Sequence, residues 1–73
     1  MAQKQQEPAL LDVVALLVDQ AGALARGQVG TIVERLDERT ALVEFSDDKG
    51  KAYAVMPCSM SDLMVLHYAP ETA

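Results

Sequence analysis

Apolar and polar residues alternate along much of the chain, and this pattern predicts short β-strands separated by turns. The cleanest period-two segment is ALVEF (residues 41–45), and QVGTIVE (28–34) has a similar alternation. AYAVMP (52–57) is predicted to be a strand that its proline ends, and LMVLHY (63–68) to be a short last strand. These segments are joined by short polar stretches, so no long helix is expected in this part of the chain.

The first apolar run, ALLDVVALLV (9–18), fits two structures. As a helix it would begin near Pro8 and carry one apolar stripe. As a strand it would place six apolar residues between Asp12 and Asp19, which is an ordinary strand length. We favour the strand because the segments that follow are strands, although the helix stays open. A strand without alternation is expected to be covered on both faces.

Glycines and small polar residues mark the turns. SDDKGK (46–51) is typical of a hairpin turn in which Gly50 takes a positive φ. In ARGQVG (25–30), Gly27 is expected to form a turn, and Gly30 to permit a bulge or close packing. CSMSDL (58–63) resembles a single helical turn capped by one of its serines, Ser59 or Ser61.

The pattern therefore predicts an all-β fold, a small five-stranded SH3-like barrel with one short helical turn before the last strand. One domain is expected over residues 9–68, between a flexible N-terminal tail (1–8) and a C-terminal tail (69–73). The alternation also predicts the side chains of the core, which are Val14, Leu16, Val29, Val33, Val43, Phe45, Tyr53, Val55, Leu63 and Val65.

Composition narrows the class of protein. The chain has 73 residues, a formal net charge of −5 and one cysteine, Cys58, so an internal disulfide and a cysteine-based zinc site are excluded. No apolar run approaches the length that crosses a bilayer, and the first residues lack the pattern of a signal peptide. We expect a cytoplasmic protein that binds no membrane, and the acidic balance argues against nucleic acid.

Four blocks of the sequence carry a family resemblance: LLDVVALL (10–17), RGQVGTIVE (26–34), VEFSDDKGKAYAV (43–55) and DLMVL (62–66). In order and spacing they resemble the bacterial family DUF4926, whose activity is unassigned. The resemblance implies a stand-alone small barrel, in some cases encoded beside toxin-like genes, and it transfers no catalytic residue. The loop between the first two blocks departs from the family, because the proline and the aromatic or second apolar residue frequent there are missing.

The glycines of the segment that starts at Arg26 suggest two kinds of ligand site. A phosphate-binding loop needs a following lysine and helix, and here a predicted strand follows instead. Gly27, Gly30 and Ile32 resemble the KOW element of RNA-binding barrels over about ten residues. The basic residues are scattered among acids without stacking aromatics, so a KOW-like RNA-binding module is kept only as an alternative function.

Few residues of the chain could take part in catalysis or bind a metal ion. Cys58 and His67 are the conceivable nucleophile and base, with Asp62 as an orienting group. A buried packing role for Cys58 and a surface position for His67 are the simpler interpretations. Asp47 and Asp48 lack the spacing of a calcium loop and fit a hairpin turn. We therefore expect no enzyme activity, no metal and no cofactor.

An excess of apolar side chains predicts an interface. A small barrel has one interior, so only one face of the first strand can be buried in it. The other face is expected to contact a protein, together with apolar residues of later strands; the predicted interface is Val13, Ala15, Leu17, Ile32 and Leu42. We expect a homo-oligomer or a protein-binding module. An antitoxin- or immunity-like partner of a basic protein is the other alternative.

Overall fold

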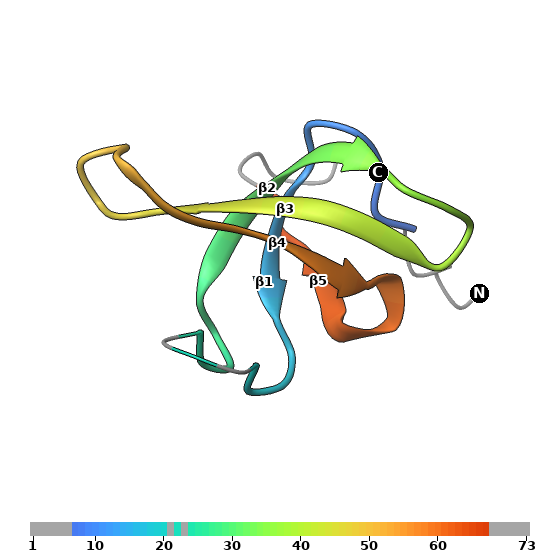
Figure 1. Ribbon diagram of the computed structural model, residues 1–73, viewed down its shortest axis with the longest axis horizontal. Coiled ribbons are helices and arrows are strands. Elements are labelled where there is room, and N and C mark those ends of the chain that lie inside the picture. The colour runs from blue at the N-terminus through green and yellow to red at the C-terminus, as the bar shows by residue number, and fades with distance from the viewer. Residues whose placement is uncertain (1–6, 21, 23, 68–73) are drawn as a thin grey trace.

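The five predicted strands form one antiparallel sheet that bends around its core. The computed structural model describes residues 7–20, 22 and 24–67. The strands are β1 (Val13–Leu16), β2 (Val29–Arg35), β3 (Thr40–Ser46), β4 (Ala52–Ser59) and β5 (Leu63–Val65), and the 3-10 turn η1 (Met60–Asp62) precedes β5. Their order across the sheet is β4-β3-β2-β1-β5, and β3 and β4 cross over β1 and β5 (Figure 1). The predicted all-β class, with five strands and one short helical turn, is confirmed.

The first apolar run is a strand, but a shorter one than its composition suggests. β1 pairs with β2 on one side and with β5 on the other, so backbone partners surround it. At its end the N–H of Leu17 donates to the carbonyl of Asp62, and the N–H of Gly27 donates to the carbonyl of Leu16, so the end of β1 is held by both neighbours. The chain then bends at Leu17 and Val18, before Asp19. The helix alternative for this segment is wrong.

The glycine turns form as expected. Gly50 has φ +82°, and the side chain of Asp47 accepts hydrogen bonds from the backbone N–H groups of Lys49 and Lys51, each at 2.9 Å. Gly27 has φ +94° in the turn before β2. The η1 turn begins after Ser59, but no serine side chain caps it. Ser59 thus occupies the predicted cap position, but the capping hydrogen bond expected of its side chain is absent.

β4 does not end at Pro57, and the reason lies in the hydrogen-bond pattern. The N–H of Met60 donates to the carbonyl of Arg39 at 2.7 Å, so Thr40 and Ser59 form a pair without mutual hydrogen bonds. Pairs with and without mutual hydrogen bonds alternate along an antiparallel ladder. The Leu42–Pro57 pair lies two residues before the Thr40–Ser59 pair in β4, so it also lacks mutual hydrogen bonds. The ring nitrogen of Pro57 therefore faces away from β3, at the free edge of the sheet, where proline is tolerated.

A tight turn at Ala9–Asp12, here called the leucine turn, leads into β1. The N–H of Asp12 donates to the carbonyl of Ala9 at 3.0 Å, and the N–H of Ala9 donates to the Asp12 carboxylate at 2.9 Å. Leu11 has φ +69°. Its N–H bonds the carbonyl of Ile32, while the N–H of Ile32 bonds the carbonyl of Asp12, which is the bonding of a β-bulge that normally has glycine at this position. Leucine here costs about 1–2 kcal/mol of backbone strain.

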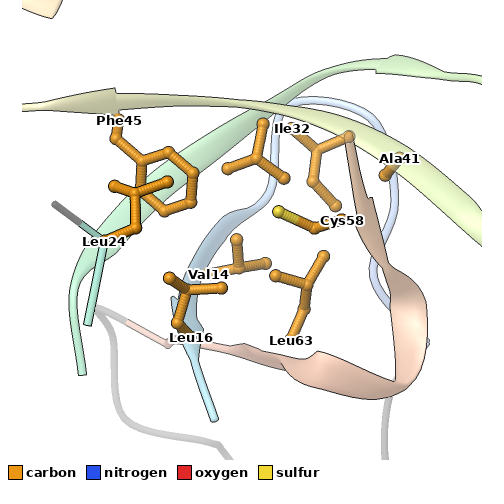
Figure 2. Packing of buried hydrophobic residues seen from close by; sticks show 9 residues of the cluster. Val14, Leu16, Leu24, Ile32, Ala41, Phe45, Cys58 and Leu63 are labelled. Atoms are coloured by element: carbon orange, nitrogen blue, oxygen red, sulfur yellow. The ribbon is translucent and has the colours of Figure 1, made fainter. Parts of the chain in front are cut away.

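The core lies between the crossed halves of the sheet. Figure 2 shows side chains of every strand meeting there, with Leu24 of the β1–β2 loop beside Phe45. The buried cluster is Val14, Leu16, Leu24, Ile32, Ala41, Val43, Phe45, Cys58 and Leu63. Of the predicted core, Val14, Leu16, Val43, Phe45 and Leu63 are confirmed, and Val65 is partly buried against the cluster.

Four predicted core residues are wrong, since Val29, Val33, Tyr53 and Val55 are exposed. In β2 the inward positions belong to Gly30 and Ile32, and Gly30 lies opposite Phe45 in the register. Gly30 has no side chain, which leaves space in the inward row for the ring of Phe45. Val29 precedes this inward pair of β2 residues and Val33 follows it, and both face outward. In β4 the inward positions are occupied by smaller or more flexible residues, which are Ala54, Met56 and Cys58.

Candidate functional site

The outer face of the sheet has two neighbouring rows of residues, in which exposed apolar side chains lie among smaller, half-buried and polar ones. Residues directly opposite in an antiparallel sheet project to the same side. The first row runs Met64, Ala15, Val29 across β5, β1 and β2. The second runs Val13, Thr31, Glu44, Val55 across β1, β2, β3 and β4. We call these seven residues together with Tyr53 the outer face.

Tyr53 extends the outer face at the far end of β4. It occupies the position where the β3–β4 register shifts, between the Ser46–Ala52 and Phe45–Ala54 pairs. Its hydroxyl lies 2.6 Å from the side-chain nitrogen of Gln28, which donates to it. This contact places the ring next to the start of β2, close to Val29. An amphipathic ring that is 46 % exposed suits a protein contact, since it offers apolar area and a hydrogen-bonding group together.

The structure redistributes the residues predicted for the interface. Ile32 is completely buried in the core, so its inclusion in an outward patch is wrong. Ala15 projects outward but is buried, because its small side chain lies between the larger Met64 and Val29 in the register. Val13 and Leu42 project outward and are half-buried, and Leu17 is exposed just after β1. Sequence reasoning missed Val29, Tyr53 and Val55, because it assigned these residues to the core.

Cys58 and His67 do not form a catalytic pair. Cys58 is 2 % exposed within the core, and its thiol lies 3.7 Å from the carbonyl of Met56. Burial raises the pKa of the Cys58 thiol above its ordinary value of 9.0, and the nearby Asp62 carboxylate raises it further. A protonated, inaccessible thiol is a poor nucleophile. His67, by contrast, is exposed after the last strand.

Cys58 is therefore expected to react with a thiol reagent only through unfolding. At pH 8 the native protein should react far more slowly with an aromatic disulfide reagent than the protein in denaturant does. Because the raised pKa belongs to the folded state, the stability associated with the neutral thiol is fully present below pH 9.0 and decreases as the pH rises above it. Rapid labelling of the native protein, at the rate of the unfolded chain, would contradict the buried position.

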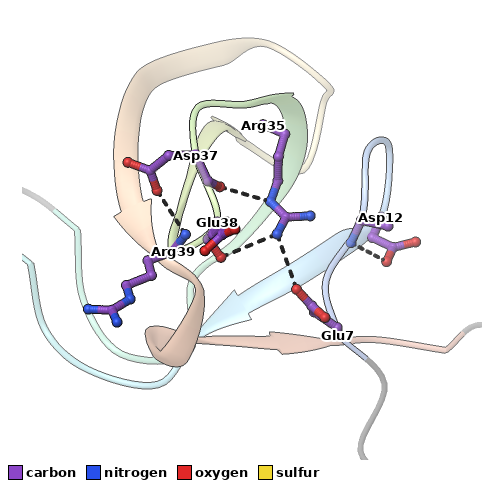
Figure 3. Close-up of polar contacts among 7 residues, drawn as sticks. Glu7, Asp12, Arg35, Asp37, Glu38 and Arg39 are labelled. Atoms are coloured by element: carbon purple, nitrogen blue, oxygen red, sulfur yellow. Dashed lines mark hydrogen bonds and ion pairs between the residues drawn. The ribbon is translucent and has the colours of Figure 1, made fainter.

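The charged side chains near the β2–β3 hairpin support the loop rather than a ligand (Figure 3). The guanidinium of Arg35 donates to the carbonyls of Asp37 and Glu38 and forms an ion pair with Glu7 at 3.1 Å. The N–H of Arg39 donates to the Asp37 carboxylate at 2.8 Å and lowers the pKa of that carboxyl group. Arg35 thus has its charge balanced within the chain, which reduces what it offers to a phosphate backbone.

The part of the chain that the structure describes has neither a metal-binding cluster nor a membrane-spanning helix. No three His, Cys, Asp or Glu side chains gather there in a way that could hold a metal ion. None of the helices within the described residues has the length and apolar character needed to traverse a bilayer. The exposed apolar residues of the outer face are the candidate site.

Comparison with known proteins identifies the family. The family model described as "Domain of unknown function (DUF4926)" matches residues 10–65, from the leucine turn to the end of β5. The chain belongs to the DUF4926 family. No curated protein and no solved structure matches the sequence. The surface of this DUF4926 domain is therefore the basis for proposing its function.

Proposed function

We propose that this DUF4926 domain is a non-enzymatic protein-binding module that self-associates through its outer face. The observation that supports the proposal is the set of large apolar side chains at the outward positions of β2, β4 and β5. Val55 is 52 % exposed, and Val29, Tyr53 and Met64 are each exposed by more than two fifths. Large exposed apolar side chains that project from one face of a small sheet are a usual mark of a protein contact.

The edges of the sheet are less suited to association than its face. β4 is one edge, and Pro57 interrupts its row of outward N–H groups. The other edge, β5, has only three residues. Proline and short length are devices that prevent strand addition at a sheet edge. A second copy is therefore expected to pack face against face, as sheets do in sandwiches, with the side chains of the outer face between the two copies.

Light scattering after size-exclusion chromatography tests the proposal. At tens of micromolar we expect the mass of a dimer or a larger assembly for the wild-type protein. Replacing Val55 with serine should shift the population toward the monomer, because it places a hydroxyl group where an apolar side chain is buried by the partner. Leu36→Ser, an exposed leucine outside the outer face, is the matched control and should leave the mass unchanged. A wild-type monomer at this concentration would rule out self-association.

A further inference from the structure

The leucine turn (Ala9–Asp12) is the most exposed apolar part of the described chain. Leu11 is 71 % exposed and Leu10 is 58 % exposed, the two largest values among the large hydrophobic residues. Backbone bonds to Ile32 hold the turn against β2, so its position relative to the sheet is defined. Val33, the next residue of β2, is exposed as well, at the point where the β2–β3 register shifts. We call these three exposed residues, which the backbone bonds to Ile32 bring into neighbouring segments, the apolar projection.

The side chain of Leu11 contributes too little to the stability of the fold to offset the strain of its backbone. Its side chain is mostly in solvent, and its φ of +69° is one that glycine adopts without strain. The bulge and its hydrogen bonds would form as well with glycine at this position, because those bonds use only backbone groups. Stability of this chain therefore does not account for leucine here. A strained and exposed apolar residue is instead what a contact with another molecule would require.

The charges around the turn indicate the chemistry of that molecule. Asp12 closes the turn, and exposed Glu34 follows Val33 on β2. Arg35, the cation of this region among the described residues, is paired with Glu7. The apolar projection is thus bordered by negative charge. Two copies placed turn against turn would bring like charges together, and an anionic lipid surface would be repelled in the same way.

We propose that the leucine turn docks a basic protein, with Leu10 and Leu11 inserted into an apolar pocket whose rim carries lysine or arginine side chains facing Asp12 and Glu34. The inference rests on the protein-binding part of the proposed function. It does not depend on self-association, because the leucine turn lies outside the outer face. The alternative function expected from the sequence, an antitoxin- or immunity-like partner of a basic protein, would then use the leucine turn as its contact surface.

Affinity capture from cells of the native host, followed by direct binding with the purified captured protein, tests the inference. The wild type and the control Val18→Ser, at an exposed valine after β1, should retain a basic protein that a Leu10→Ser, Leu11→Gly double variant loses. With the purified partner, Leu11→Gly should weaken the affinity by at least about tenfold, as expected for a buried contact residue. Glu34→Gln should weaken binding mainly at low salt. Leu11→Gly should keep a thermal midpoint at or above that of the wild type, which separates lost contact from lost folding.

Three outcomes would overturn the inference, and the second and third also identify what replaces it; a fourth bears only on the outer-face dimer. Failure of the wild type to retain any protein that the double variant loses would mean that the turn docks no partner. Loss of self-association in the double variant would assign the turn to a second copy. Sedimentation with phosphatidylcholine–phosphatidylglycerol vesicles that depends on Leu10 and Leu11 would assign it to a membrane. A monomeric wild type that still binds the basic protein through the turn would refute only the outer-face dimer.

Discussion

Replacing Phe45 with alanine is expected to lower the free energy of unfolding by about 3–5 kcal/mol. The ring is completely buried, and it is the largest of the fully buried side chains. It lies in the inward row between Gly30 and Ala54, two small residues that cannot extend into the space it would leave. A cavity therefore remains in the variant, and its cost adds to the lost transfer of the ring from water. For a domain of this size, such a loss is comparable to its whole stability.

Urea unfolding followed by circular dichroism measures this loss, with Tyr53→Ala as the matched aromatic control. Tyr53 is half-exposed on the outer face and has one hydrogen bond, to Gln28. Its removal should cost no more than about 1 kcal/mol. Equal losses for the two variants would mean that the inward and outward faces of β3 and β4 are assigned incorrectly.

Gly30→Ala is expected to destabilise the fold by about 3 kcal/mol, the upper end of the range for overpacked cores. A Cβ atom at this position would lie 2.6 Å from Cγ1 of Val43, 2.9 Å from the carbonyl oxygen of Glu44 and 2.9 Å from Cδ1 of Phe45. The oxygen belongs to the backbone of β3, which is hydrogen-bonded within the sheet between β2 and β4. It cannot move aside without disturbing the ladders on both sides, so the methyl group has no accessible space.

Gly27→Ala is the control for this prediction, since it adds the same methyl group in open space. A Cβ atom at Gly27 would meet nothing within 4 Å, and only its φ of +94° opposes alanine. The expected cost is about 1 kcal/mol, from the left-handed backbone alone. Thermal melts of the two variants should rank Gly30→Ala well below Gly27→Ala. The reverse order would show that conformation and not packing is what requires glycine at the start of β2.

The local pattern predicted some elements correctly because short-range chemistry determines them. The hairpin at Asp47–Gly50 follows from a turn-forming aspartate and a glycine that accepts positive φ, and both act within a few residues. The alternation in residues 41–45 assigns Val43 and Phe45 to the core because β3 has partners on both sides and little irregularity. Where the local alternation agrees with the strand pairing in this way, the sequence alone predicts which side chains are buried.

The local pattern predicted the core incorrectly where apolar residues of two segments could fill the same space. Val29 and Val33 look like core residues by hydropathy, but Gly30 and Ile32 take the inward row because Phe45 from β3 needs the space above Gly30. Leu24 comes from a loop without periodicity, and it enters the core beside Phe45 (Figure 2). Nothing in a single segment shows which of several apolar residues will fill a shared volume.

By itself, the sequence determined the all-β class, the number of strands, the glycine turns and the family. These properties depend on periodicity and on backbone preferences that each segment carries alone. Tertiary structure alone decided which apolar side chains remain outside. Cross-strand register brings Val29, Val55 and Met64 onto one outer face, and a backbone bond to Ile32 holds the exposed Leu11 in its strained turn. Both candidate contact surfaces arise from pairings between segments distant in the chain, which local patterns do not encode.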